Sequence, residues 1–358
     1  MGTLLEFLIV LILFTNVITL FYIYRQNRRM KKSQIKGPKI VVIGGGTGQS
    51  TLLRGLKKYT DNITAIVTMA DDGGSSGILR EEMGMLPPGD IRNCIVALSN
   101  AEPDMQKIMH YRFKEGSLKD QSFGNLFLAA LNDSYGDFEL AVTKISDILS
   151  VRGKVLPVTL ENVDLVAELE NGVLVNGESK IGPEVLKHNS KIKKLRLKPE
   201  NVEPYEEVIH AIGAADLVII GPGSLYTSII PNLLTDRVVE ALDHSEAKKM
   251  YICNVMTQAG ETDHLNVLGH LNAVLEHSEN KHIVDMILVN KEKVPEEFLT
   301  KYAEEMSNPI YLDREQRQEL EKMKIKVIQG NFLKFDDDVI RHNEEKLAKI
   351  IIDNYNYF

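Results

Sequence analysis

Residues 39–48, KIVVIGGGTG, decide the fold of this chain. Four consecutive β-branched residues after Lys39 predict a buried strand, and the glycines that follow predict a tight loop. Leucines then recur at helical spacing within residues 50–59, and residues 63–68 are typical of a second buried strand. Strand, glycine loop, helix and strand, in this order, indicate the opening of a doubly wound parallel sheet.

Later segments continue the α/β pattern. Strands are predicted at residues 217–220, 250–254, 283–289 and 325–328, and helices after residue 204 and at 343–352. At residues 155–198 the pattern changes to short alternating runs separated by Asn-Gly dipeptides, which are typical of hairpin turns. We therefore expect one domain over residues 38–358, a Rossmann-like, doubly wound, mostly parallel sheet with a small antiparallel β insertion.

The composition of the 358 residues is that of a globular protein. Hydrophobic residues make up 44% and charged residues 26%, which argues against a disordered or fibrous chain. The formal net charge is −8, whereas a general nucleic-acid binder carries the opposite sign, so we expect no nucleic-acid partner. Two cysteines, Cys94 and Cys253, exclude a disulfide framework and a four-thiolate metal site.

An apolar run at residues 4–24 is long enough for a bilayer, which takes about 20 residues. Basic residues follow the run from Arg25 onward, and none precedes it. Basic residues stay on the cytoplasmic side, so residues 1–37 predict a transmembrane helix and a basic juxtamembrane segment. The expected location is the cytoplasmic membrane, single-pass, with the N-terminus outside and the C-terminal domain in the cytoplasm. The alternatives are that the run is a buried helix or that the predicted start of the protein lies too far upstream. In either case the expected location is the cytoplasm.

Two glycine-rich loops are expected at the carboxyl ends of strands, where open parallel sheets bind ligands. In the first, residues 44–48, missing Cβ atoms let backbone N–H groups approach a phosphate at a helix N-terminus. The loop lacks the Gly-Lys-Ser/Thr of a P-loop, and Gln49 replaces the third glycine of the dinucleotide fingerprint. The second loop, residues 221–228, adds hydroxyls on the next turn and predicts a second anion site. A tight turn without a ligand is the alternative for the first loop.

Several polar side chains are further candidates. Asp71 and Asp72 follow a predicted strand, where adjacent carboxylates can hold a divalent cation or ribose hydroxyls. Asp90, after a Pro-Pro-Gly break, and Asn125, at a helix start, can face the cleft or cap a helix. Arg341 precedes the last predicted helix and suits a bidentate phosphate contact or a solvated surface position.

The motifs, taken in order, resemble the bacterial gluconeogenesis-factor family (YvcK type), a branch of the CofD-like, or 2-phospho-L-lactate transferase, superfamily. The match covers residues 39–352 and rests on VVIGGGTGQSTLLRGLK, MADDGGSSG, PPGDIRN, SFGNLFLAAL, VLPVT, GPGSLYTSIIPNLL and YICNVMTQAGET. The resemblance implies a Rossmann-like core with one shared ligand-binding cleft. Carried over onto this sequence, the cleft comprises Gly44, Gly45, Gly46, Thr47, Gly48, Asp71, Asp72, Asp90, Asn125, Gly223, Ser224 and Tyr226, with Arg341 as the diphosphate-holding arginine.

The resemblance leaves two hypotheses for the activity. Members of the gluconeogenesis-factor branch resemble binders of UDP-sugars such as UDP-N-acetylglucosamine, needed for cell shape and peptidoglycan synthesis during gluconeogenic growth. This implies a regulatory factor, and no catalytic residue is assigned to it. The alternative is a Mg²⁺-dependent transferase of the phospholactyl type that acts on a nucleotide-linked substrate, with Asp71 and Asp72 as the metal ligands. Mg²⁺ is the only cofactor that we expect, and only for the transferase. The sequence does not decide whether the protein forms a homo-oligomer.

Overall fold

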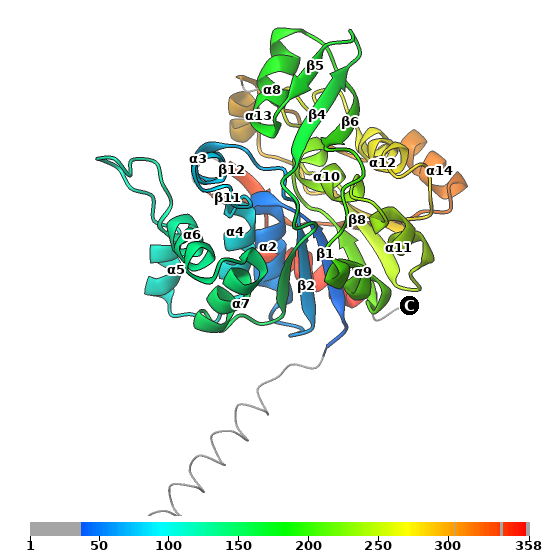
Figure 1. The fold of residues 1–358 in the computed structure, drawn as a ribbon. Helices are drawn as coiled ribbons and strands as arrows, with labels where there is room; N and C mark the ends of the chain where they lie inside the picture. The colour runs from blue at the N-terminus through cyan, green and yellow to red at the C-terminus, as the bar shows by residue number, and fades with distance from the viewer. Residues whose placement is uncertain (1–36, 305, 337–338, 356–358) are drawn as a thin grey trace, which may run out of the picture.

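A seven-stranded sheet forms the centre of the computed structural model, which describes residues 37–304, 306–336 and 339–355 (Figure 1). Every pairing in this sheet is parallel. In spatial order the strands are β10 (Lys326–Gly330), β9 (Met286–Asn290), β8 (Lys248–Ile252), β7 (Leu217–Ile220), β1 (Ile40–Gly44), β2 (Ile63–Val67) and β3 (Lys154–Pro157). The mostly parallel α/β class predicted from the sequence is confirmed.

The order of strands reverses between β1 and β7. From β1 the chain proceeds through β2 to β3 on one side, and from β7 through β8 and β9 to β10 on the other. The loops that leave these two strands therefore diverge, and ligands of open α/β sheets bind in the resulting crevice. Both glycine-rich loops follow these strands, so the fold brings them side by side.

Helices cover both faces of the sheet, which explains why β1 and β7 are buried along their whole length. Before the antiparallel insertion the helices are α2 (Gly46–Leu56), α3 (Gly74–Met83), α4 (Gly89–Leu98), α5 (Pro103–Met109), α6 (Phe123–Tyr135) and α7 (Phe138–Ile148). After them come α8 (Glu178–Lys187), α9 (Glu206–Gly213), the π-helical turn η1 (Leu225–Ile229), α10 (Ile230–Leu233), α11 (Val238–His244), α12 (Val267–Glu276), α13 (Glu296–Glu304), α14 (Arg314–Lys322) and α15 (Glu344–Tyr355). Figure 1 shows α2 and α4 on one side of β1 and β2, and α9 and α11 on the other.

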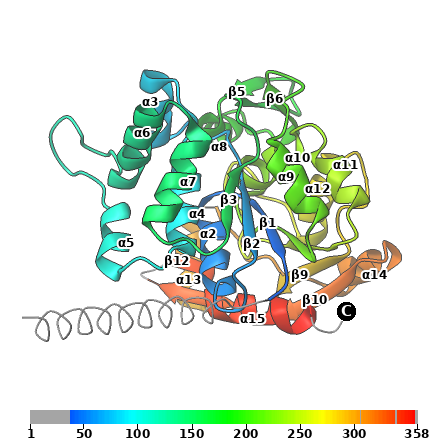
Figure 2. The ribbon, with the colours of Figure 1, turned by 60° about the horizontal axis from the view of Figure 1, so that its bottom comes forward.

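The last helix of the described residues lies beside the first one. Helix α15 packs against α2, and Figure 2 shows the two close together. Gly55 permits this approach, since a Cβ there would lie 2.0 Å from the carbonyl oxygen of Glu344. The C-terminal segment is thereby held beside the helix that begins at the first glycine loop.

Two small antiparallel sheets flank the carboxyl ends of the main sheet. The larger consists of β5 (Leu174–Asn176), β4 (Asp164–Leu169) and β6 (Ile192–Lys198), and α8 lies between β5 and β6 in the chain. The smaller is a hairpin of β11 (Leu333–Asp336) and β12 (Val339–His342). The insertion predicted at residues 155–198 starts too early: β3 belongs to the main sheet, because its apolar residues pair with β2.

The fold class needs one correction. The longest helix in the described part, α6, has 13 residues, whereas about 20 are needed for a bilayer. No helix within the described ranges is long and apolar enough to cross a membrane. Within these ranges the predicted fold class is corrected to an α/β sheet with small antiparallel sheets and without a spanning helix. The segment assigned to it, residues 4–24, lies outside the described residues.

A buried glutamine, Gln49, fixes the helix that follows the first glycine loop to the sheet. Nε2 of Gln49 donates to the carbonyl oxygens of Val42 and Ile66, at 2.9 Å each, and so ties α2 to β1 and β2. Sγ of Cys94 donates to Oε1 of Gln49 at 3.4 Å. The glutamine at the third glycine position of the dinucleotide fingerprint thus fixes the loop on the sheet.

Candidate functional site

The two glycine loops meet backbone to backbone at the carboxyl ends of β1 and β7. Gly45 precedes the first turn of α2, and Gly46 has a φ of +66°, in the left-handed region. A Cβ on Gly48 would lie 2.8 Å from the carbonyl oxygen of Pro222. Glycine is therefore required here by contact between the loops, and their N–H groups border one cleft.

The substitution Gly48→Ala is expected to lower the free energy of unfolding by about 1–3 kcal/mol, because two backbone segments must separate to admit the methyl group. Gly213→Ala is the matched control: its Cβ would meet open space at the end of α9, so stability should stay at or slightly above that of the unsubstituted protein. Chemical denaturation of both variants measures the difference. Equal stability of the two would contradict the proposed contact between the loops.

The first of two neighbouring cavities contains the glycine loops and an arginine. Its volume is about 480 Å³. It is lined by Gly45, Gly46, Thr47, Gly48, Thr51, Gly223, Ser224, Ser228, Asn254, Val255, Met256, Tyr302, Ile340, Arg341 and His342. Arg341 comes from β12, so the C-terminal hairpin carries the arginine to the loops. None of the described residues that line this cavity is a carboxylate.

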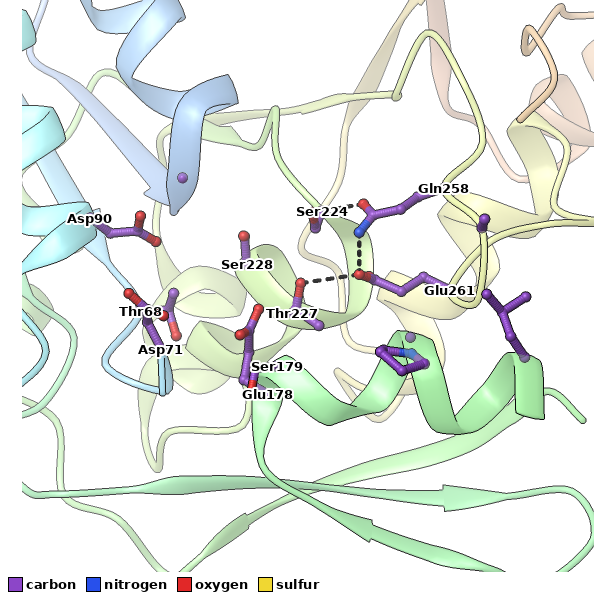
Figure 3. A pocket seen from close by; sticks show the side chains of 15 residues that line it. Thr68, Asp71, Asp90, Glu178, Ser179, Ser224, Thr227, Ser228, Gln258 and Glu261 are labelled. Carbon is purple, nitrogen blue, oxygen red and sulfur yellow. Dashed lines mark hydrogen bonds between the residues drawn. The ribbon is translucent and has the colours of Figure 1, made fainter. Parts of the chain in front are cut away.

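The second cavity is acidic. Its volume is about 620 Å³, and it shares Gly46, Ser224 and Ser228 with the first. Its lining comprises Gly46, Thr68, Asp71, Asp90, Glu178, Ser179, Gly182, Pro183, Leu186, Ser224, Thr227, Ser228, Gln258, Ala259 and Glu261 (Figure 3). Four of these are carboxylates, and no described lining residue is basic. We call the two spaces the arginine cavity and the acidic cavity.

Burial and mutual repulsion raise the pKa values of three carboxyl groups in the acidic cavity. Burial, followed by the charges of Asp71, Glu261 and Asp72, raises the pKa of Glu178 to about 8. Burial raises the pKa of Glu261 to about 7, although hydrogen bonds from Thr227 and backbone groups oppose the shift. Glu178 therefore holds a proton at neutral pH, and Glu261 titrates near it, so these carboxyl groups can both donate and accept hydrogen bonds.

Asp90 contacts the first glycine loop. Burial and the neighbouring Asp71 raise its pKa to about 6, whereas a hydrogen bond from the backbone N–H of Gly46 opposes this. Asp90 lies in the first turn of α4, whose N-cap is Pro88, so it does not cap the helix. A Cβ on Gly45 would lie 2.7 Å from Oδ2 of Asp90, which shows how closely this carboxylate approaches the loop.

The structure brings most of the predicted site residues to the two cavities. Gly45, Gly46, Thr47, Gly48, Asp71, Asp90, Gly223, Ser224 and Arg341 all line one or both. Gly44, Asp72, Asn125 and Tyr226 line neither. Asp72 accepts from the backbone N–H of Ser179 at 2.8 Å and so holds the start of α8. The amide of Asn125 bonds Nε of Arg92 at 3.1 Å and Oγ of Ser75 at 3.2 Å, in a buried polar network.

Sequence reasoning missed the residues that reach the cleft from distant elements. Glu178 begins α8, directly after the Asn-Gly turn of the insertion, and Tyr302 belongs to α13. Neither has a local signal, since both lie in ordinary polar or amphipathic contexts. Glu261 follows β8 in a stretch that is unusually polar for a connection, and this composition was the available signal.

The donor set of the acidic cavity fits Mg²⁺ only with help from a ligand. No group of three or more His, Cys, Asp or Glu side chains in the described part of the chain is arranged to hold a metal ion. Mg²⁺, however, is usually held by one or two carboxylates together with substrate phosphates and water. Asp71 and Asp90 interact electrostatically and line one wall, which suits that mode. Asp72 is turned toward α8 instead.

A Rossmann-like sheet with glycine-rich loops at its switch point defines an α/β protein of the doubly wound class, whose open sheets bind ligands at this place. The model of the family "2-phospho-L-lactate transferase CofD" matches residues 40–333. The chain belongs to this CofD family, and within it to the gluconeogenesis factors, as the resemblance of its motifs implied.

Relatives and a solved structure support this placement. A putative gluconeogenesis factor of Clostridium acetobutylicum is 53% identical over 90% of this chain and 71% of the relative. The gluconeogenesis factor of Bacillus subtilis is 49% identical over 88% of this chain and 98% of the relative. A crystal structure of a UPF0052-family protein from Bacillus halodurans superposes with a TM-score of 0.83 at 45% identity, covering 88% of this chain and 99% of that one.

Proposed function

We propose that this protein binds a UDP-sugar of the UDP-N-acetylglucosamine type as a regulatory ligand, and thereby serves cell shape and cell-wall synthesis under gluconeogenic growth. The observation that carries the proposal is the division of charge along the cleft. The arginine cavity has N–H-rich glycine loops and Arg341, whereas the acidic cavity has four carboxylates. The names of the relatives support a role in gluconeogenic growth.

The diphosphate of such a ligand belongs at the wall that the two cavities share. Backbone N–H groups at the start of α2 favour an anion, and Arg341 can bond phosphate oxygens in a bidentate manner. No described lining residue of the acidic cavity is basic, whereas Arg341 lines the other cavity, so the diphosphate is favoured on the arginine side. This arrangement leaves one cavity for the nucleoside and the other for the sugar.

The arginine cavity suits a nucleobase. Oδ1 of Asn254 and Nε2 of His342 are buried without a hydrogen-bond partner in the described part of the chain. Nδ2 of Asn254 donates to the carbonyl oxygen of Gly223 at 2.9 Å, which leaves Oδ1 as an acceptor. Burial lowers the pKa of His342 to about 4, so its ring is neutral at pH 7. A base edge with both donors and acceptors would satisfy these atoms.

A Mg²⁺-dependent transferase is a second candidate, favoured by the proximity of Asp71 and Asp90. Mg²⁺ bound by these carboxylates and by the ligand's phosphates would neutralise charge at the reacting phosphate. The residues of this chain would orient the ligand: the glycine loops hold the diphosphate, and Asp90 fixes the first loop through the N–H of Gly46. The sequence-based assignment of Asp72 as a ligand stays a prediction.

Isothermal titration of the full chain with UDP-N-acetylglucosamine, with and without Mg²⁺, followed by product analysis, tests both functions. Regulatory binding predicts association that does not require Mg²⁺ and returns the ligand intact. Metal-dependent binding with breakdown of the ligand would replace it with the transferase. Absence of binding to any uridine nucleotide under both conditions would remove the UDP-sugar proposal.

A further inference from the structure

We propose that Glu178 and Glu261 form a subsite that exchanges hydrogen bonds with the hydroxyl groups of the ligand's sugar, and so distinguish a nucleotide sugar from the free nucleoside diphosphate. The inference rests on the proposed function, because it takes the diphosphate to lie at the glycine loops. It adds the residues that recognise the sugar and the chemistry by which they do so.

The two carboxylates approach the cavity from elements far apart in the sequence. Glu178 is the first residue of α8, in the antiparallel insertion, and Glu261 lies in the connection after β8. Both line the acidic cavity, and the charge of Glu261 contributes to the raised pKa of Glu178, which places the two within electrostatic range. Figure 3 shows Glu261 on the side of Thr227 from which Gln258 approaches, and Glu178 below Thr227, beside Ser179.

One oxygen of Glu261 is held by the protein and the other is not. Oε1 accepts from Oγ1 of Thr227 at 3.3 Å and from Nε2 of Gln258 at 2.5 Å. Oε2 is buried and has no hydrogen-bond partner in the part of the chain that the structure describes. A buried carboxylate oxygen without a donor costs free energy, and a ligand hydroxyl would supply the missing bond.

Hydrogen bonds connect this carboxylate to the phosphate loop. Oε1 of Gln258 accepts from Oγ of Ser224 at 2.8 Å, while its Nε2 donates to Glu261 (Figure 3). Ser224 lines both cavities. A ligand whose diphosphate rests on the second glycine loop therefore has its next group, the sugar, directed toward Glu261.

The lining selects hydroxyl donors rather than a further anion or a metal ion. Since the described lining residues of the acidic cavity include no Lys, Arg or His, a phosphate or carboxylate there would meet no cation. No described cluster of three potential metal ligands is present. Serine and threonine hydroxyls on the same walls suit a polar, uncharged group, and about 620 Å³ is ample space for a hexose.

The test compares UDP with UDP-N-acetylglucosamine by isothermal titration of the full-length protein and its Glu261→Ala and Glu178→Ala variants, since glutamine would mimic a protonated carboxyl. The unsubstituted protein should bind the sugar nucleotide at least 10-fold more tightly than UDP. Each variant should lose most of that ratio while binding UDP within about 2-fold of the unsubstituted protein, because only the sugar meets these carboxylates. Unchanged UDP affinity also shows that the variant is folded.

Glu184→Ala is the control, since this residue lies on the same helix, pairs with Lys187 at 2.8 Å and lines neither cavity. It should leave both affinities unchanged. Preserved preference for the sugar nucleotide in both cavity variants, or equal weakening of both ligands, would overturn the inference and leave the proposed function standing. Equal affinity of the unsubstituted protein for UDP and UDP-N-acetylglucosamine would also overturn the inference alone, whereas failure to bind either would overturn the proposed function, and this inference with it.

Discussion

Replacing Glu178 with glutamine is expected to stabilise the protein at alkaline pH and to leave its stability at pH 4 nearly unchanged. Burial, with the charges of Asp71, Glu261 and Asp72, raises the pKa of Glu178 from 4.5 to about 8. The folded state thus holds a proton that the unfolded chain releases near pH 4.5. The stability linked to this proton is fully present below pH 4.5 and is lost as the pH rises through about 8.

The expected gain for Glu178→Gln at pH 9 is about 2–4 kcal/mol in the free energy of unfolding, which discounts the full pKa shift for partial exposure. Urea denaturation at pH 4 and pH 9 measures it. Glu184 provides the opposite case on the same helix: its hydrogen bond with Lys187 lowers its pKa, so Glu184→Gln should bring no gain at pH 9. An equal effect of Glu178→Gln at both pH values would contradict the raised pKa of the Glu178 carboxyl.

Arg341→Ala is expected to weaken the binding of UDP and of UDP-N-acetylglucosamine about 100-fold each. Arg341 is a cation on the described wall of the arginine cavity, and a charge-assisted bond to phosphate contributes about 1.5–3 kcal/mol. Both ligands share the diphosphate, so their affinities should fall together, unlike the selective loss expected at Glu261. Isothermal titration at constant ionic strength measures both.

Arg341→Lys should recover only part of the affinity, because lysine retains the charge but not the planar, bidentate geometry. Arg314→Ala, on the exposed start of α14, removes the same charge outside both cavities and should leave binding unchanged. A loss of similar size in Arg314→Ala would indicate a general effect of net charge. Unaltered binding in Arg341→Ala would place the diphosphate elsewhere.

Local sequence predicted the strands of the main sheet other than β3 because each contains a short apolar run. Residues 217–220 agree with β7 as predicted, and the predicted strand at 63–68 differs from β2 by one residue. The start of the insertion was misplaced because β3 has an apolar pattern that suits either sheet, and only its pairing with β2 decides between them. The hairpin of β11 and β12 was also missed, because short local runs do not show which segments pair, and only the tertiary structure does.

The glycine loops of the site were predictable, whereas the opposite walls were not. A glycine run directly after a buried strand indicates its own role, since the requirement for missing Cβ atoms is local. Glu178 and Tyr302 reach the cleft through an insertion and a helix that begin far from it, at positions with no local mark. Asp72 and Asn125 were assigned from their motifs, but their hydrogen bonds go to Ser179, Ser75 and Arg92.

The sequence by itself determined the α/β class, the position of both glycine-rich loops and membership of the gluconeogenesis-factor branch, because these depend on short patterns in a fixed order. Only the tertiary structure decided which charges face each other. Arg341 and the glycine loops share one cavity, and Asp71, Asp90, Glu178 and Glu261 share the next. The physical reason is that electrostatic repulsion and desolvation depend on distance and burial in space, and separation along the chain predicts neither.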